Sequence, residues 1–340
     1  MMHGKSRILL AVLACVGILA GSSCGKDDIT ELSYEYISGS LSFSLPDYVS
    51  PNTEYTAVPA GVYRSDGGDF GYYWVLSTSG SVRDTTKWEG DGPTVSGAYS
   101  FRSPSSLETF TLSGTVYAYN HVGSTFTKTM TVVDPSLDGS LKGRDFGPDA
   151  QTYTDDRDAR VYRYRRIASL DWMLQNLAYT GAGVTMANCE VMNDPYGRYY
   201  TWDEAKTVCP AGWRLPSGAD WDTLAASLKA QAGGTYKGIA GELMSNATFN
   251  GSRMWDYWPA VKITNETHFC AVPTGYAIVD GNGQGTFFGN LEYAAFWTSD
   301  SYNDEQGVYR YIFASRPDVM VGNGHKDSFA ASVRCVRDAE

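Results

Sequence analysis

The stretch from Tyr196 to Leu224 constrains the fold most tightly, because it contains two start signals for helices. Thr201 with Glu204 forms the first signal, and an identical Ser/Asp spacing over 217–220 forms the second. In this pattern a hydroxyl and a carboxyl group satisfy the free backbone N–H groups at a helix N-terminus. Apolar residues follow each signal at helical spacing: Trp202, Ala205, Val208 and Cys209, then Trp221, Leu224 and Leu228. The sequence therefore predicts two short amphipathic helices joined by a tight turn over 212–216.

The N-terminus indicates export. Lys5 and Arg7 precede an apolar run over 8–19 that is too short to remain as a membrane-spanning helix. This arrangement is typical of a secretory signal peptide, which we expect over residues 1–23. Small residues then lead directly to Cys24, which resembles the lipid-attachment site of a bacterial lipoprotein. An ordinary cleaved signal peptide is the alternative.

The residues after Cys24 indicate where the protein is displayed. The Gly-Lys-Asp-Asp sequence over 25–28 is similar to the charged tag of surface-exposed lipoproteins in Bacteroidetes-type bacteria. We therefore expect a lipidated tether over 24–31 and an outer-membrane protein, lipid-anchored and facing the cell exterior. A lipid on Cys24 attaches a protein to a membrane without a spanning helix.

The charge of the chain argues against nucleic acid as a partner. Removing Lys5 and Arg7 with the signal leaves 25 of the 27 basic side chains against 38 acidic ones. Such a surface repels nucleic acid and anionic lipid. Nucleic acid is therefore not expected as a partner.

The cysteines are confined to the second half of the mature chain. Beyond Cys24 they are Cys189, Cys209, Cys270 and Cys335. Four cysteines in an oxidising compartment indicate two disulfides, with three possible connectivities. A zinc site is the competing interpretation, but it requires more closely spaced ligands. We expect no metal and no cofactor.

Residues 32–135 have the pattern of an all-β unit. Leu41, Phe43 and Leu45 alternate with serines, and the same period of two continues through 110–118 and 126–132. Turn-rich clusters separate these segments, which suggests a β-sandwich. Trp74, within an aromatic block over 70–76, is expected to fill its core. The unit resembles an immunoglobulin-like or polycystic-kidney-disease-type module, although it has no disulfide.

A Gly-, Asp- and Ser-rich segment over 136–150 has no periodicity and is predicted to be a linker. A series of motifs follows it: T-D-D-R-D and V-Y-R-Y-R-R-I over 154–167, W-M-L-Q-N-L over 172–177, Y-G-R-Y-Y-T-W over 196–202, C-P-A-G-W-R-L-P over 209–216, N-E-T-H-F and V-P-T-G over 265–275, F-W-T-S over 296–299 and S-V-R-C-V-R-D over 332–338. In order and spacing these motifs over 151–338 resemble the Fibrobacter succinogenes major paralogous domain.

The resemblance implies an α+β domain with a C-type-lectin-like fold, distantly similar to formylglycine-generating enzymes. It implies a strand pair over 154–167 and a helix over 172–177. In lectin-like folds a cysteine after an early helix is bridged to one on the last strand, which corresponds here to Cys209 and Cys335. Cys189 and Cys270 are then left to pair with each other. The expected molecule is multidomain, with an immunoglobulin-like sandwich before the lectin-like domain.

Catalysis is not expected, because the chain contains no nucleophile elbow, zinc-protease motif or phosphate-binding loop. If Cys209 and Cys335 are bridged, no reactive cysteine pair of the formylglycine-generating type remains. The loop over 280–285 only partly resembles a calcium loop, and a hairpin turn is the simpler interpretation. Asp300, Asn303, Asp304 and Glu305 form a denser oxygen cluster, but they too lack the ligand motifs of calcium-dependent lectins.

Aromatic and polar residues over 251–305 are the candidate ligand site. They are Trp255, Tyr257, Trp258, Asn265, Glu266, Asp300 and Asn303. Ring faces stack on apolar patches of sugars, and amide and carboxylate groups orient the hydroxyls. Packing of the tryptophans in the core is the alternative. The expected function is adhesion or glycan or protein binding, with an accessory role in a pilus or polysaccharide-uptake complex as the second possibility and a formylglycine-generating-type enzyme as the third.

Overall fold

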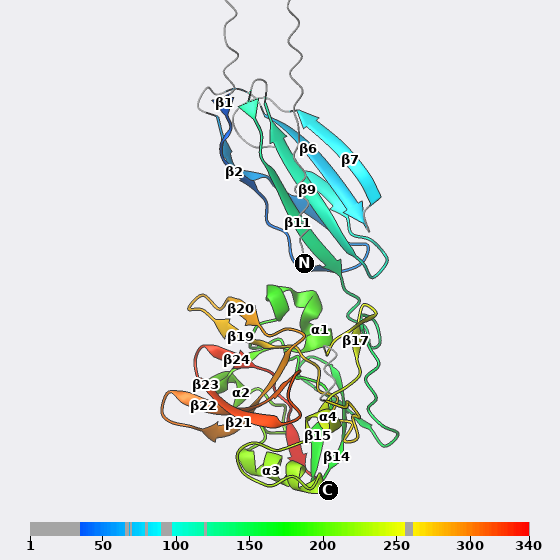
Figure 1. Cartoon of the computed structure of the whole chain (residues 1–340), viewed down its shortest axis with the longest axis vertical. Coiled ribbons are helices and arrows are strands. Elements are labelled where there is room, and N and C mark those ends of the chain that lie inside the picture. Colours follow the sequence, from blue (N-terminus) through cyan, green and yellow to red (C-terminus); the bar gives the residue numbers. More distant parts are fainter. Residues whose placement is uncertain are drawn as a thin grey trace, which may run out of the picture.

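The computed structural model describes residues 35–64, 68, 70–78, 81–89, 97–118, 121–255 and 261–339. The predicted signal peptide, Cys24, the tether and the aromatic residues Tyr257 and Trp258 lie outside these residues. Within them the chain forms two units, stacked along the long axis of the molecule in Figure 1. Both are rich in strands and the helices are short, so the protein is a β-rich multidomain protein. None of the helices in the described part of the chain is long and apolar enough to cross a membrane.

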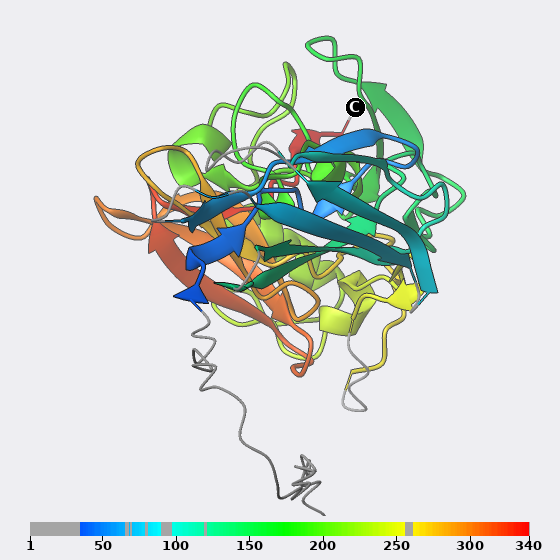
Figure 2. The same ribbon diagram turned by 90° about the horizontal axis from the view of Figure 1, so that it is seen from above.

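The first unit is a sandwich of strands. They are β1 (Glu35–Tyr36), β2 (Ser38–Ser42), β3 (Tyr48–Val49), β4 (Glu54–Ala57), β5 (Ala60–Tyr63), β6 (Gly71–Thr78), β7 (Ser81–Glu89), β8 (Tyr99–Arg102), β9 (Thr109–Tyr117), β10 (His121–Val122) and β11 (Thr125–Val132). A five-stranded sheet has the order β3-β11-β9-β6-β7, and the pairs β2–β5 and β4–β8 supply the facing layer. This layering is visible from the side in Figure 1 and from above in Figure 2.

The predicted alternation in the first unit is confirmed. Leu41, Phe43 and Leu45 are all buried, and so are the inward residues of β9. Trp74 lies on β6, between β9 and β7, and is 1% exposed. Its ring stacks on Tyr99 with centroids 5.7 Å apart and meets Phe43 edge-on at 5.3 Å. The indole therefore fills the sandwich core, as its sequence context predicts.

The second unit contains the remaining elements. Its strands are β12 (Leu141–Lys142), β13 (Gln151–Thr154), β14 (Val161–Ile167), β15 (Leu170–Met173), β16 (Tyr200–Thr201), β17 (Thr248–Phe249), β18 (Ser252–Arg253), β19 (Tyr276–Val279), β20 (Gly285–Phe288), β21 (Tyr293–Ser301), β22 (Gln306–Phe313), β23 (Val319–His325), β24 (Phe329–Ala331) and β25 (Val336–Asp338). Its helices are α1 (Asn193–Tyr196), α2 (Trp202–Ala205), α3 (Gly218–Ser227) and α4 (Ala240–Leu243), with single 3₁₀ turns η1 (Met186–Asn188) and η2 (Glu190–Met192).

Four small sheets form the second unit. Their orders are β13-β14-β15-β25, β16-β24-β19-β20, β21-β22-β23 and β12-β17-β18. The last strand, β25, pairs with β15 near the start of the unit, so the two ends of this part of the chain meet in one sheet. An aromatic core centred on Trp172, Trp221 and Phe269 packs beneath α3 and β21.

The predicted linker is largely part of the second unit. Ser140 is fully buried, and Leu141 and Lys142 pair with β17. The backbone oxygen of Asp145 accepts hydrogen bonds from the side chains of Asn265 and Cys270. From Ser140 onward the predicted linker is therefore packed into the second unit, because polar turn residues here find partners on distant segments.

The two helix starts are confirmed and one predicted helix is not. Thr201 and Ser217 each form a complete capping box, at the N-termini of α2 and α3. The segment over 172–177, predicted as a helix, instead begins within strand β15. The residues of β15 are all buried and pair with β14 on one side and β25 on the other. Burial on both faces removes the alternation that marks a strand in sequence.

One of the two predicted disulfides is confirmed. Cys209 and Cys335 are bonded across a separation of 126 residues. Cys189 and Cys270 are both free and buried, so their predicted pairing is wrong. The Cys270 thiol lies beside Asn265 and Asp145, whereas Cys189 packs with Met192 and Tyr48 where the two units meet. Different parts of the core surround the two thiols.

Candidate functional site

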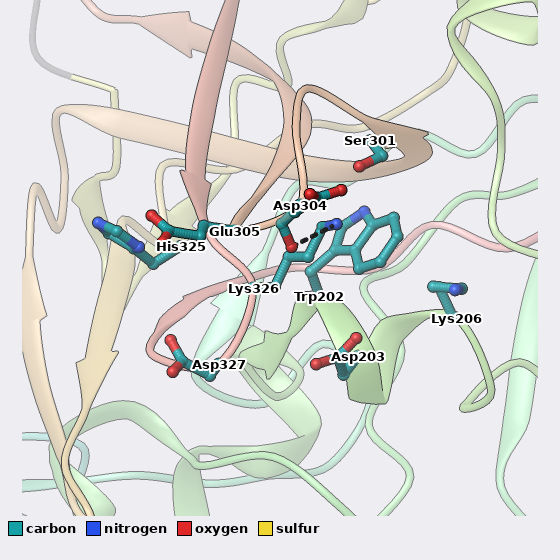
Figure 3. A pocket seen from close by; sticks show the side chains of 9 residues that line it. All are labelled: Trp202, Asp203, Lys206, Ser301, Asp304, Glu305, His325, Lys326 and Asp327. Carbon is teal, nitrogen blue, oxygen red and sulfur yellow. Dashed lines mark hydrogen bonds between the residues drawn. The ribbon is translucent and has the colours of Figure 1, made fainter.

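A hollow of about 780 Å³ lies on the surface of the second unit. Figure 3 shows the side chains around it, which are mostly charged. They are Trp202, Asp203, Lys206, Ser301, Asp304, Glu305, His325, Lys326 and Asp327. We call this site the charged hollow. Three segments that are distant in sequence supply its walls: α2 with the residues just after it, the β21–β22 turn, and the β23–β24 connection.

Main-chain hydrogen bonds hold these three segments together. The backbone oxygen of Lys326 accepts from the N–H groups of Trp202 and Asp203 at 3.0 and 3.4 Å. The Lys326 N–H in turn donates to the backbone oxygen of Glu305 at 2.9 Å. The chain around Lys326 therefore joins the start of α2 to the β21–β22 turn, and the wall residues are held on a fixed framework.

Trp202 forms the base of the charged hollow. It is 5% exposed, and its Nε1 donates to the backbone oxygen of Thr298 at 2.9 Å. The ammonium groups of Lys206 and Lys326 lie 4.5 and 4.6 Å from the centre of its ring system. Gly307 lies so close that a Cβ atom there would come within 2.3 Å of the indole. The ring is thus covered and is not an open stacking surface for a ligand.

Two lysines face the charged hollow, and neither forms an ion pair with a carboxylate of the described residues. The Lys326 ammonium donates to the backbone oxygens of Asn303 and Asp304 at 2.8 and 3.0 Å, and Figure 3 marks the second of these bonds. Lys206 is held by its contact with the Trp202 ring. Cation–π contacts of this kind stabilise by about 0.5–1 kcal/mol at exposed sites.

Four carboxylates complete the wall. Asp203, Asp304, Glu305 and Asp327 are all exposed, and none forms an ion pair within the described residues. The Asp, Glu and Lys side chains of the lining carry four negative and two positive charges. The charged hollow is therefore rich in hydrogen-bond acceptors and has a net negative charge.

The structure places Trp255 and Asn265 inside the protein. Trp255 is 1% exposed and its Nε1 donates to the backbone oxygen of Ala271 at 3.0 Å. Asn265 is 7% exposed, and its amide group donates to the backbone oxygen of Asp145 and accepts from the Cys270 N–H. The prediction that these two residues contact a ligand is wrong, because both are fully used in packing and backbone contacts.

Asp300 and Asn303 have structural roles beside the charged hollow. One Asp300 oxygen accepts from the N–H of Gly218 at 2.9 Å, at the first residue of α3. The Asn303 side-chain oxygen accepts from two backbone N–H groups of the β21–β22 turn, at Glu305 and Gln306. Both residues therefore position the turn that carries Asp304. Glu266 is exposed and does not line the charged hollow.

Sequence reasoning missed most of the charged hollow. Asp304 and Glu305 belong to the oxygen cluster noted in the sequence, but none of the motifs of the second half covers residues 325–327. No local pattern shows that Lys326 lies against Trp202, more than a hundred residues away.

Within the described part of the chain, no group of three or more His, Cys, Asp or Glu side chains is placed to hold a metal ion. The loop over 280–285 is the hairpin turn between β19 and β20, and Asp280 accepts from its backbone N–H groups.

Comparison with known proteins identifies the family. The model of the Fibrobacter succinogenes major domain matches residues 166–337, half of the chain. The protein belongs to this family, as the motifs over the second half predict. No curated protein matches the chain. Among solved structures, the chain is similar to the CARDB domain of a Pyrococcus furiosus protein in complex with di-metal ions, with 18% identity and a TM-score of 0.22. That likeness covers 32% of this chain and all of that one, and nothing about fold or ligand follows from it.

Proposed function

We propose that this protein is a surface-exposed bacterial lipoprotein whose second unit binds a glycan or protein ligand in the charged hollow. The observation that carries the proposal is the wall of four unpaired carboxylates around two lysines, built on a fixed base. Carboxylates accept hydrogen bonds from sugar hydroxyls or from basic side chains, and the lysines donate to ligand oxygens. The first unit would act as an immunoglobulin-like spacer between membrane and ligand.

A C-type-lectin-like fold for the second unit is part of the proposal. Two features support it. The Cys209–Cys335 bridge joins the segment after α2 to the chain just before β25. Pairing of β15 with β25 brings the start and end of the unit into one sheet. In lectin-like folds such a base carries long loops, and the proposal assigns this role to the turn between β21 and β22, which supplies Asp304 and Glu305 to the charged hollow.

We also propose a binding role without catalysis. Two cysteines are joined in the disulfide, and the remaining two described thiols lie in separate parts of the core. A close pair of reactive thiols, which an oxidase of the formylglycine-generating type uses, is not formed by the described cysteines.

The binding proposal is tested with residues 25–340 on an array of glycans and host proteins, with and without calcium. The double variant Asp304→Asn/Glu305→Gln and the single variant Lys326→Met should each weaken binding of the ligand found by at least tenfold. Glu266→Gln is the matched control, because it removes an exposed carboxylate outside the charged hollow. Unchanged binding in both hollow variants would reject the site, and a basic protein as the only ligand would favour the accessory role in a surface complex.

The lipid anchor has its own test. Cys24→Ala should move the protein from the outer-membrane fraction to the soluble fraction of the cells, because the acyl chains are lost. External protease applied to whole cells should degrade the unaltered protein if it faces outward. Retention of the variant in the membrane would contradict the anchor, and protection from protease would contradict surface display.

A further inference from the structure

A second pocket, of about 260 Å³, is lined by arginines. It lies where the connection between the two units passes β14 and the segment after β15. Its polar lining is Arg144, Arg160, Arg163, Gln175, Asn176 and Asp194, and we call it the arginine pocket. Three guanidinium groups face one carboxylate there, in a chain whose formal net charge is −11. Its local charge is opposite to that of the whole protein.

Among the described residues, ion pairs neutralise one of the three arginines. Arg160 donates to Asp158 and to Asp194, which uses the single carboxylate of the lining. Arg144 and Arg163 form no ion pair within the described residues. The Nε of Arg144 is buried and has no hydrogen-bond partner there, although its guanidinium lies 5.3 Å from the centre of the Phe146 ring. A buried donor without a hydrogen-bond partner is unfavourable, so a partner from outside the chain would stabilise it.

A further buried arginine lies behind the pocket. Arg334 is 1% exposed and donates to the side-chain oxygen of Asn176 at 2.7 Å and to the backbone oxygens of Phe269 and Cys270 at 2.7 and 3.1 Å. It has no carboxylate partner among the described residues. A cavity of about 10 Å³ adjoins Arg334, Arg144 and Asn176, and it shares Asn176 and Arg144 with the arginine pocket.

Burial disfavours the charge on both inner arginines. Loss of water lowers the pKa of Arg334 to about 9 and also lowers the pKa of Arg144, although Asp138 acts on Arg144 in the opposite direction. A positive charge on either guanidinium has little solvent to stabilise it. A negative group in the arginine pocket would offset this cost.

We propose that the arginine pocket binds an oxyanion, a carboxylate, sulfate or phosphate group of a ligand, through Arg144 and Arg163. The planar guanidinium presents parallel N–H donors that match two oxygens of such a group. The fixed positive charge of Arg334 adds attraction from behind. This site is separate from the charged hollow and does not depend on the function proposed for it.

The test is isothermal titration of residues 25–340 in low-chloride buffer with three probes: inorganic sulfate, inorganic phosphate and glucuronate. Saturable binding of at least one probe at a single site is expected, and the order of affinities identifies the kind of oxyanion. Arg144→Gln and Arg163→Gln should each weaken that binding at least tenfold. Arg316→Gln, at an exposed arginine outside the pocket, should leave it unchanged.

Thermal unfolding of each variant separates lost binding from lost folding. If Arg144→Gln does not fold, Arg163→Gln decides alone. Asp304→Asn/Glu305→Gln should bind the probe as the unaltered protein does, which separates this site from the charged hollow. Absence of saturable binding for all three probes, or equal loss in Arg316→Gln, would overturn the proposal.

Discussion

Several side chains of the second unit are buried and form hydrogen bonds through their polar atoms. Trp255 and Asn265 illustrate this, since each places its polar group against a backbone partner inside the core. Asp155 is another case: its side chain is fully buried and accepts two hydrogen bonds from the Arg157 guanidinium, at 2.9 and 2.7 Å, and one from the Arg157 backbone N–H at 3.1 Å. Residues that the sequence marks as candidates for ligand binding therefore serve the packing and hydrogen bonding of the core.

Trp255→Ala is expected to lower the free energy of unfolding by about 3–5 kcal/mol, because it empties a large buried site and removes the partner of the Ala271 oxygen. Urea denaturation measures the change. Glu266→Ala, at an exposed position nearby, should stay within about 0.5 kcal/mol. A Trp255→Ala variant that is stable but has lost ligand binding would instead show that Trp255 contacts the ligand.

The Asp155–Arg157 pair predicts a pH dependence of stability. Hydrogen bonds from Arg157 lower the pKa of Asp155 below its usual value of 3.8. The folded state therefore binds this proton less readily than the unfolded state, and the stabilisation is complete above the unfolded pKa. It is lost as the pH falls through the lower folded value.

Asp155→Asn should cost about 1.5–3 kcal/mol at neutral pH, since a charge-assisted pair is broken. The free energy of unfolding of Asp155→Asn should also fall less than that of the unaltered protein between roughly pH 5 and 2. A carboxyl group whose pKa is lowered by folding loses its stabilising effect over about this range. Chemical denaturation across this range measures both effects. Asp156→Asn is the control, because Asp156 is exposed. Parallel pH curves for Asp155→Asn and the unaltered protein would contradict the assignment.

At the scale of elements, local signals decide where helices begin but not how long they are. Both capping boxes form, yet α2 extends only over Trp202–Ala205 while α3 continues to Ser227. The chain after α2 turns into the segment that carries Cys209, and the disulfide there fixes its path. The start of a helix is set by its own residues, and its end by what it packs against.

Ser217→Ala should lower the free energy of unfolding by about 1 kcal/mol, within a range of 0.5–2, because the N–H of Asp220 loses its side-chain partner. Thermal or urea unfolding measures it. Thr223→Ala, at an exposed position within the same helix, should have an effect of about 0.5 kcal/mol or less. Equal effects of the two substitutions would show that the cap contributes nothing specific.

At the scale of the whole molecule, a disulfide within the second unit and contacts between the two units organise the protein. The Cys209–Cys335 bridge closes most of the second unit into a loop. Between the units, the Asn250 side chain donates to the backbone oxygen of Val132 at 2.8 Å, and the rings of Tyr48 and Phe249 meet edge-on at 6.4 Å. The connection between the units is therefore packed on both sides.

Replacing both Cys209 and Cys335 by alanine should lower the free energy of unfolding of the second unit by roughly 4 to 5 kcal/mol, from the loop entropy of the unfolded chain. Calorimetry should show the transition of the second unit moving down while that of the first unit stays. Peptide mapping without reduction should find one linked pair and free thiols at Cys189 and Cys270. A free Cys209 thiol in folded protein would contradict the structure.

The sequence by itself determined the local features of this protein. The helix starts at Thr201 and Ser217, the alternating strands of the first unit, the hairpin at 280–285 and the family of the second half all follow from residues close together in the chain. These features depend on hydrogen bonds and side-chain periodicity within a few positions, so the sequence displays them directly.

Tertiary structure decided the rest. Only the fold buries Trp255, turns the segment at Leu170–Met173 into a strand between two others, and separates Cys189 from Cys270. Only the fold brings Lys326 to Trp202, and Arg144 to Arg163 and Arg334. Each of these outcomes depends on contacts between segments far apart in the chain, and the free energy of such contacts has no signature in either segment alone.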